Sequence, residues 1–153
     1  MDPTQNREYL KEIEAYAALP LPWEKLKDSS VLISGATGMI GSYLIDLLMA
    51  KNQLHSLDCK IYAISRSEER ARARFAPYWD REDFQYFSQD INQELTLPPF
   101  HADYVIHGAS NTHPVAYATD PIGTILTNII GTTHLLDLAD KIRCRRFVFL
   151  SSV

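Results

Sequence analysis

Three glycines at a spacing of three residues form the stretch of this sequence best suited to hold a ligand. Gly35, Gly38 and Gly41 follow the apolar run 31–33 and precede a segment whose apolar residues recur at helical spacing. This pattern predicts a strand, a glycine turn and the start of a helix. The first N–H groups of a helix have no partner within it and lie at the positive end of its dipole, and glycine lets a ligand approach the backbone. The expected ligand group is therefore a diphosphate.

The turn and its immediate neighbours are the candidate diphosphate-binding residues. Their spacing, G-x-x-G-x-x-G, is a variant of the G-x-G-x-x-G pattern found in dinucleotide-binding turns. The residues expected to contact the cofactor here are Gly35, Thr37, Gly38, Met39, Ile40 and Gly41. A tight strand-to-helix turn that binds no ligand is the alternative interpretation.

The residue that would contact the ribose of such a dinucleotide is expected at the end of the next strand, 60–65. Dinucleotide-binding sheets carry an acidic residue there when they bond the ribose 2′-hydroxyl, but this sequence has Arg66 followed by Ser67. A guanidinium group can pair with a 2′-phosphate because its planar fork matches phosphate oxygens. Arg66 therefore favours NADP over NAD. The alternative is a solvated arginine at the start of an arginine-rich helix.

The strands that must position these residues are expected at five apolar segments: 31–33, 60–65, 84–87, 103–107 and 146–150. Helical patterns alternate with strands, so the sequence predicts an α/β fold, a doubly wound parallel sheet of Rossmann-like type that stops after its fifth strand. Ligands bind such sheets beyond the carboxyl ends of the strands. Residues at those ends should converge on one crevice: Gly35, Arg66, Asp90, Gly108, Ser151 and Ser152.

The longest helical pattern spans 122–142. Six of its residues are expected to face inward: Ile122, Ile125, Leu126, Ile129, Leu136 and Ala139. This helix either covers the sheet only or also supplies a dimer face.

Composition and charge exclude several classes of function. Of 153 residues, 46% are hydrophobic, which is enough for a packed core, and the net charge of -4 gives no reason to expect nucleic-acid binding. No apolar run is long enough to span a membrane, and the start of the chain lacks the features of an export signal. Cys59 and Cys144 are expected to be buried free thiols in a reducing cytoplasm. The five histidines lack metal-ligand spacing, so no metal site is expected.

Two parts of the chain are expected from these patterns. Residues 1–30 form a helical arm, read either as a packed cap or as a partner-binding segment, and residues 31–153 form the dinucleotide-binding domain.

Several segments together resemble the N-terminal, cofactor-binding part of the extended short-chain dehydrogenases/reductases, the group of nucleotide-sugar epimerases and dehydratases. They are the glycine turn 35–41, the pair Asp90 and Ile91, the H-G-A-S segment 107–110, the D-P…N…G-T-x-x-L-L pattern within 120–136, and F-V-F-L-S-S at 147–152. The turn departs from the usual T-G-x-x-G-x-x-G pattern at its first residues. The motifs are specific in combination, and they cover most of 31–153.

The resemblance implies roles for residues outside the glycine turn. Further cofactor contacts are implied for Asp90, Ile91, Gly108, Ala109, Ser110, Asn128 and Ser151. Ser152 would be the catalytic serine and would hydrogen-bond the sugar hydroxyl that is oxidised. For Asp90 the alternative is an Asx turn. For Asn128 it is a buried polar residue that ties strand ends together. His107 could be an acid/base residue or a metal ligand, but packing beside the cofactor at the strand end is the favoured interpretation.

The activity implied by the resemblance is a transient oxidation of a nucleotide sugar at C4, followed by epimerisation, dehydration or decarboxylation. The general base of the family belongs to a Tyr-x-x-x-Lys pair beyond the strand-five serines, and this sequence stops at Val153. We therefore expect a fragment, without the substrate-binding region, that binds NAD(P) but is catalytically incomplete. A homodimer is expected from the family. The alternative from another class is a non-catalytic dinucleotide-sensing module of the same fold.

Overall fold

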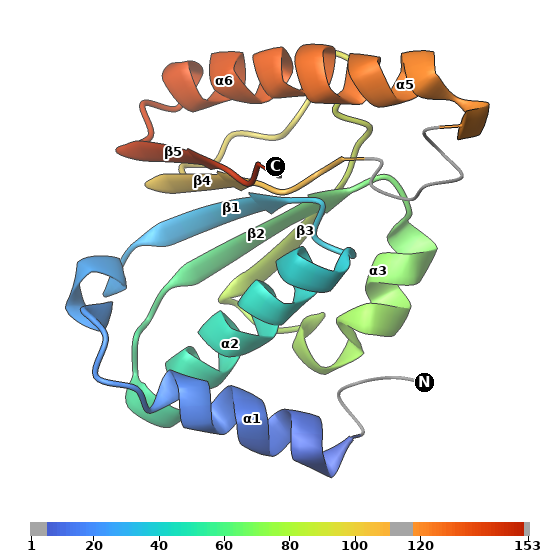
Figure 1. The fold of residues 1–153 in the computed structure, drawn as a ribbon. Helices are drawn as coiled ribbons and strands as arrows, with labels where there is room; N and C mark the ends of the chain where they lie inside the picture. Colours follow the sequence, from blue (N-terminus) through green and yellow to red (C-terminus); the bar gives the residue numbers. More distant parts are fainter. Residues whose placement is uncertain (1–5, 111–117, 152–153) are drawn as a thin grey trace.

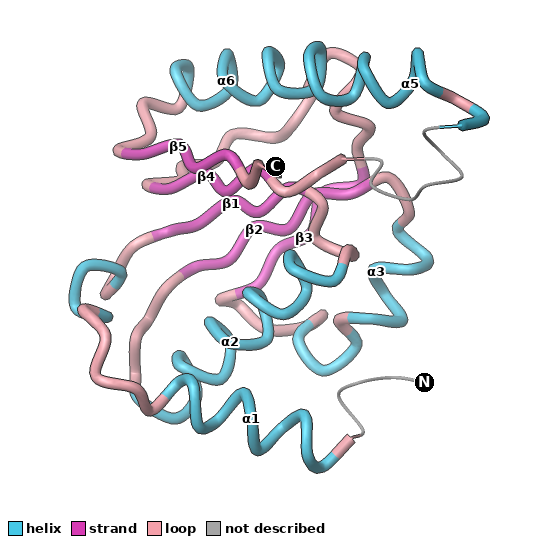
Figure 2. The backbone as a smooth tube through the Cα atoms, in the orientation of Figure 1, coloured by secondary structure: helices cyan, strands magenta, loops and turns pink. Residues whose placement is uncertain are grey.

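The computed structural model describes residues 6–110 and 118–151. Within these ranges five strands form one parallel sheet in the order β3-β2-β1-β4-β5 (Figures 1 and 2). Their bounds are β1 (Ser30–Ser34), β2 (Lys60–Ser65), β3 (Phe84–Ser88), β4 (Tyr104–His107) and β5 (Arg146–Phe149). The order runs outward from β1 in both directions, which is the doubly wound arrangement and confirms the predicted fold class.

Helices cover both faces of this sheet (Figure 1). One face carries α2 (Met39–His55) and α3 (Glu68–Arg74), followed by the short η3 (Ala76–Tyr78). The other carries α5 (Pro121–Leu126), η4 (Thr127–Gly131) and α6 (Thr132–Lys141). Strand β1 lies between β2 and β4 and is covered by helices on both faces, and every one of its residues is buried. This burial explains why β1 appears in the sequence as an uninterrupted apolar run.

The N-terminal arm packs against α2. Helix α1 (Arg7–Ala17) is capped by Asn6, whose side chain accepts hydrogen bonds from two N–H groups of the first turn. The short η2 (Trp23–Leu26) leads from the arm toward β1. Lys51 of α2 donates to the carbonyl of Ala17 at 2.7 Å, which satisfies the carboxyl end of α1. The arm is thus joined to the sheet through the helix that follows the glycine turn.

The predicted inward face of the segment 122–142 is wrong. Five of the six residues are exposed: Ile122, Ile125, Leu126, Ile129 and Leu136. Only Ala139 is buried, and the face toward the sheet is formed by Thr124, Thr127, Gly131, Leu135 and Ala139.

Close approach explains which face turns inward. A Cβ atom on Gly131 would lie 2.6 Å from Cδ1 of the buried Ile91, so a larger residue here would have to displace that side chain. The segment also contains a π turn, η4, between α5 and α6. Periodicity alone could not choose between a stripe of small residues and a stripe of large apolar ones.

Among the described residues, no helix combines the length and the apolar character needed to cross a membrane.

Candidate cofactor-binding site

Gly35 begins the turn at the end of β1 and has a conformation that favours glycine. Its φ is +69°, in the left-handed region that side chains rarely adopt. A Cβ atom here would also lie 2.7 Å from the carbonyl oxygen of Gly108 and 2.8 Å from the amide nitrogen of Ala109. The turn after β1 and the segment after β4 are therefore in direct backbone contact, and only glycine fits between them.

Helix α2 starts immediately after this turn, at Met39. The N–H of Gly38 donates to the carbonyl of Gly35 at 2.9 Å, and the N–H of Ser42 is the first to bond within the helix, to Gly38 at 2.9 Å. The N–H groups of Met39, Ile40 and Gly41 precede the first such bond, so they have no helical acceptor. These three groups form the donor set that a diphosphate requires.

The side chains of two predicted contact residues do not line the site. Met39 is 86% exposed and Ile40 is 54% exposed. Their contribution to ligand binding can therefore come only from the backbone N–H groups at the start of α2.

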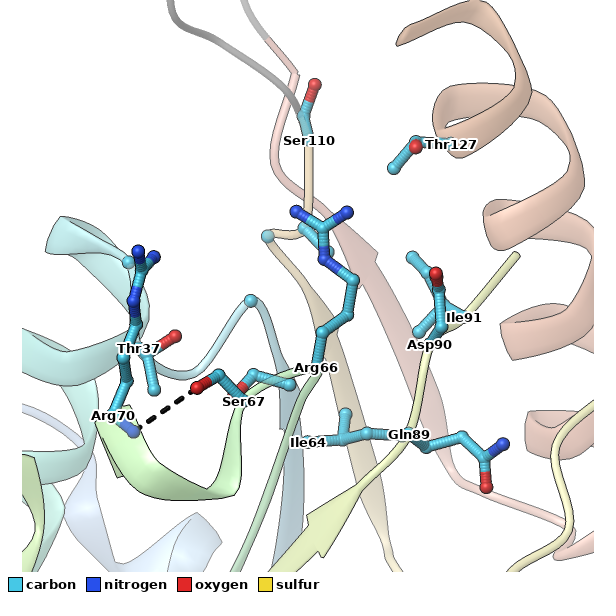
Figure 3. Close-up of a pocket in the computed structure, with 15 residues that line it drawn as sticks. Thr37, Ile64, Arg66, Ser67, Arg70, Gln89, Asp90, Ile91, Ser110 and Thr127 are labelled. Carbon is cyan, nitrogen blue, oxygen red and sulfur yellow. Dashed lines mark hydrogen bonds between the residues drawn. The ribbon is translucent and has the colours of Figure 1, made fainter. Parts of the chain in front are cut away.

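A pocket of about 300 Å³ opens beside this turn, at the carboxyl ends of the strands (Figure 3). It brings together nine of the residues predicted from the sequence: Gly35, Thr37, Gly38, Arg66, Asp90, Ile91, Gly108, Ala109 and Ser110. These residues follow four different strands, so their convergence reflects the parallel sheet rather than proximity in sequence.

The other predicted residues lie around the pocket rather than in its lining. Gly41 packs beneath the turn, where a Cβ atom would overlap the carbonyl oxygen of Gly35. Asn128 is connected to the lining, because its Oδ1 accepts a hydrogen bond from Ser110 Oγ at 2.8 Å. Ser151 is exposed just after β5. Ser152, the predicted catalytic serine, lies outside the described residues.

Sequence reasoning missed six lining residues: Ile64, Ser65, Ser67, Arg70, Gln89 and Thr127. Most of them adjoin predicted positions at the ends of β2 and β3, so a wider window around each strand end would have found them. Arg70 lies four residues beyond Arg66. Its backbone N–H donates to Ser67 Oγ, the N-cap of α3, at 3.3 Å. Thr127 belongs to the π turn, which no local pattern indicated.

Two arginines and one carboxylate set the charge of the pocket. Arg66, directly after β2, and Arg70, in the first turn of α3, are both exposed (Figure 3). Among the described residues, no carboxylate forms a salt bridge with either arginine. Both guanidinium groups therefore remain available to an anionic ligand group.

Asp90 lies at the loop after β3 and combines the two roles considered for it. Its Oδ1 accepts a hydrogen bond from the N–H of Asn92 at 3.0 Å, which is an Asx turn. The same residue lines the pocket beside Ile91. The turn therefore holds the carboxylate in place at the pocket wall.

The geometry fits a dinucleotide. The start of α2 offers N–H donors without helical acceptors, and the glycines leave room for the diphosphate. The pocket extends from this turn across the carboxyl ends of the strands. In the part of the chain that the structure describes, no three of the histidine, cysteine, aspartate and glutamate side chains come together as a metal site.

Comparison with known proteins gives relatives for most of the chain. It is 31% identical to UDP-glucuronic acid decarboxylase 1 of Danio rerio over 144 residues, or 91% of this chain, and 27% identical to UDP-glucuronic acid decarboxylase 2 of Arabidopsis thaliana over 139 residues, or 90%. Among solved structures it resembles Pen from Bacillus thuringiensis, with a TM-score of 0.65 and 28% identity over 81% of this chain.

The chain is much shorter than these relatives. It spans 32% and 29% of the two decarboxylases and 38% of Pen. The family model for the NAD dependent epimerase/dehydratase family matches residues 31–153, which is well over half of the chain and begins at β1. The chain therefore belongs to the NAD dependent epimerase/dehydratase family.

Proposed function

We propose that this chain binds a nicotinamide dinucleotide, with the diphosphate on the start of α2, and that it forms the cofactor-binding part of a nucleotide-sugar enzyme. The observation that carries the proposal is the relation between Gly35 and α2: a left-handed glycine begins the turn that lines the pocket, and the start of α2, with three N–H groups that lack a helical acceptor, follows that turn directly. Family membership supports the same assignment, because the family is NAD dependent.

The residues around the pocket take complementary roles in this proposal. The N–H groups of Met39, Ile40 and Gly41 bind the diphosphate, and Thr37 lies at the same turn. Asp90 and Ile91 form the wall for the adenine. The chemistry that NAD or NADP supplies when bound is reversible acceptance of a hydride.

The segment after β4 and the end of β5 complete the proposed site. Gly108, Ala109 and Ser110 lie along the dinucleotide, with Asn128 holding the Ser110 hydroxyl. Ser151 and Ser152 follow β5, where the reacting part of the cofactor is proposed to lie. Ser152 is proposed as the residue that hydrogen-bonds the sugar hydroxyl.

A preference for NADP forms part of the proposal. Arg66 replaces the acidic residue that would bond a ribose 2′-hydroxyl, and Arg70 adds a second guanidinium on the same side of the turn. Two cations at this position favour a 2′-phosphate.

The substrate and reaction of the whole protein are proposed from the relatives, two of which are UDP-glucuronic acid decarboxylases. We propose a nucleotide sugar that is oxidised transiently at C4, with the general base contributed by residues beyond those of this chain. A non-catalytic dinucleotide sensor would share the pocket but would show no turnover in the full-length protein.

A homodimer is proposed through the outer face of α5, η4 and α6. Ile122 is 69% exposed and Ile129 is 59% exposed, and Ile125 and Leu126 extend the same apolar surface. A contiguous apolar surface of this kind is typical of an interaction site. A cytoplasmic location is also proposed, since Cys59 and Cys144 are both free thiols.

Isothermal titration calorimetry of the chain with NADPH and with NADH tests the proposal. We expect saturable binding of at least one of them, with NADPH the tighter ligand. Gly35→Val should abolish it, because valine cannot adopt the Gly35 backbone conformation beside Gly108. Absence of a binding isotherm with both dinucleotides, for a chain shown to be folded by circular dichroism, would overturn the proposal.

A further inference from the structure

His107 is the last residue of β4 and lies directly before the pocket-lining Gly108, yet it is completely buried. Its Nδ1 lies 2.7 Å from Ser34 Oγ, at the end of β1, and its Nε2 lies 3.0 Å from Thr132 Oγ1, at the start of α6. One imidazole thus connects the carboxyl ends of β1 and β4 to α6, the helix that covers one face of the sheet.

The hydrogen bonds determine which ring nitrogen carries the proton. The Thr132 hydroxyl donates its single hydrogen to the carbonyl of Asn128 at 2.6 Å. With that hydrogen used, its oxygen accepts from His107, and this pattern assigns the proton to Nε2. In a neutral ring Nδ1 then accepts from the Ser34 hydroxyl. Burial lowers the pKa of His107 below its ordinary value, which agrees with a neutral ring.

The hydrogen bonds from Ser34 through His107 and Thr132 form a relay that ends at the carbonyl of Asn128, in the π turn η4. This turn also contributes to the pocket. Thr127 lines the pocket and accepts a hydrogen bond from Asn92 Nδ2 at 3.1 Å. Asn128 accepts from Ser110 Oγ at 2.8 Å. The π turn is therefore bonded to the loop after β3 on one side and to the segment after β4 on the other.

A second contact fixes the same helix against the pocket wall. His134 Nδ1 donates to the carbonyl of Ile91 at 2.8 Å. Gly131, at the end of the π turn, packs directly against the Ile91 side chain. A shift of the π turn would therefore move Ile91 and its neighbour Asp90, which face the pocket on that side.

From these contacts we propose that His107 is a positioning residue: as the Nε2–H tautomer it holds Thr132, and through Thr132 the π turn, in the place that aligns Ser110 and the Asp90–Ile91 wall for the dinucleotide. This inference rests on the proposed function. A π turn departs from the regular helical hydrogen-bond ladder and is frequent at functional sites. A fixed side-chain anchor is what such a turn needs to keep one register.

Three single variants test this role by NADPH affinity, measured at a temperature where circular dichroism shows each to be folded. Thr132→Val removes the hydroxyl at nearly constant shape and should weaken binding roughly five- to tenfold, the scale of one lost hydrogen bond. Thr132→Ser keeps the hydroxyl and should bind like the unmodified chain. The matched control is Thr133→Val, because Thr133 makes the same type of bond, to Ile129 at 2.9 Å, on the exposed face.

Nuclear magnetic resonance tests, without any cofactor, whether His107 has the Nε2–H tautomer and whether Thr132 holds the π turn. Long-range proton–nitrogen correlations of the histidine rings, with His107 assigned from His107→Gln, should report a neutral Nε2–H ring. In Thr132→Val the amide signals of Asn92 and Ser110 should shift, whereas in Thr133→Val they should not. A Nδ1–H tautomer, an imidazolium at neutral pH, or unchanged Asn92 and Ser110 amides would overturn the inference.

The two proposals can fail separately. If the unmodified chain binds NADPH but Thr132→Val binds it as tightly as Thr133→Val does, the positioning role is wrong and the cofactor site stands. If the unmodified chain binds neither dinucleotide, the proposed function is wrong and so is a positioning role toward that ligand. The imidazole and amide measurements then still decide whether His107 holds the π turn.

Discussion

The carbonyl oxygen of Gly35 lies only 2.4 Å from the position that a Cβ atom on Gly41 would take. The first turn of α2 therefore rests on the backbone of the glycine turn itself, with no side chain between them. This contact sets how closely the start of α2 lies to the glycine turn that lines the pocket. It also explains why the third glycine is required although it contributes nothing to the pocket lining.

Gly41→Ala is expected to destabilise the chain and to weaken cofactor binding, because the new methyl group must push α2 away from Gly35. Overpacking of this kind costs roughly 1–3 kcal/mol of the free energy of unfolding. Urea denaturation measures that loss. Gly38→Ala is the graded comparison: its Cβ would lie 3.1 Å from the same oxygen, so its loss should be smaller. Equal stability of all three proteins would contradict the packing argument.

Arg66→Asp is expected to weaken NADPH binding at least tenfold and to leave NADH binding similar or improved, because the change replaces a 2′-phosphate partner with a 2′-hydroxyl acceptor. Calorimetric titration of both dinucleotides checks this. Lys27→Asp changes the net charge by the same amount at the exposed residue before β1, at the other end of the strands. An equal loss of both affinities in Arg66→Asp would argue against the assigned role.

Tyr9→Phe is expected to lower the free energy of unfolding by about 1 kcal/mol, the scale of one hydrogen bond. The Tyr9 hydroxyl donates to Asp46, a buried carboxylate of α2 that is paired with Arg74 of α3. Burial and the bond to Asp46 raise the pKa of Tyr9 above its ordinary value, so the phenol stays protonated and remains a donor.

Chemical denaturation measures the effect of that change. Tyr16→Phe is the control for Tyr9→Phe, because Tyr16 lies on the same helix and is 47% exposed. If the two variants lose the same stability, α1 is not anchored through Asp46.

Ile129→Asp is expected to shift the protein from dimer to monomer, since it places a charge in the middle of the exposed apolar face of α5, η4 and α6. Sedimentation velocity at several concentrations measures the change. Leu54→Asp introduces the same charge on α2, where Leu54 is 50% exposed, and should not alter assembly. A monomer before any substitution would remove the proposed interface.

Local patterns in the sequence were sufficient for the sheet and the glycine turn. Strand β1 is buried on both faces, so it appears as an apolar run, and Gly35 occupies a backbone conformation that few other residues tolerate. Because all strands are parallel, placing their ends also placed Arg66, Asp90 and Gly108 in one pocket. The fold, the glycine turn and the pocket residues at the strand ends were therefore predictable.

Contacts between distant segments could not be predicted in this way. The stripe that faces the sheet from α5 and α6 consists largely of small residues, chosen by close approach to Ile91, whereas periodicity favoured the large apolar stripe. The hydrogen bonds from Ser34 to His107 and from His107 to Thr132 join residues that are 73 and 25 positions apart along the chain. No spacing rule connects such residues before the tertiary structure is known.

The most direct test of the central claim is a titration of the isotopically labelled chain with NADPH, followed by the backbone amide signals of the glycine turn and the start of α2. We expect the amides of Met39, Ile40 and Gly41 to show the largest saturable shifts, because their N–H groups bind the diphosphate. Saturable shifts confined to other parts of the chain, with these three amides unchanged, would contradict it.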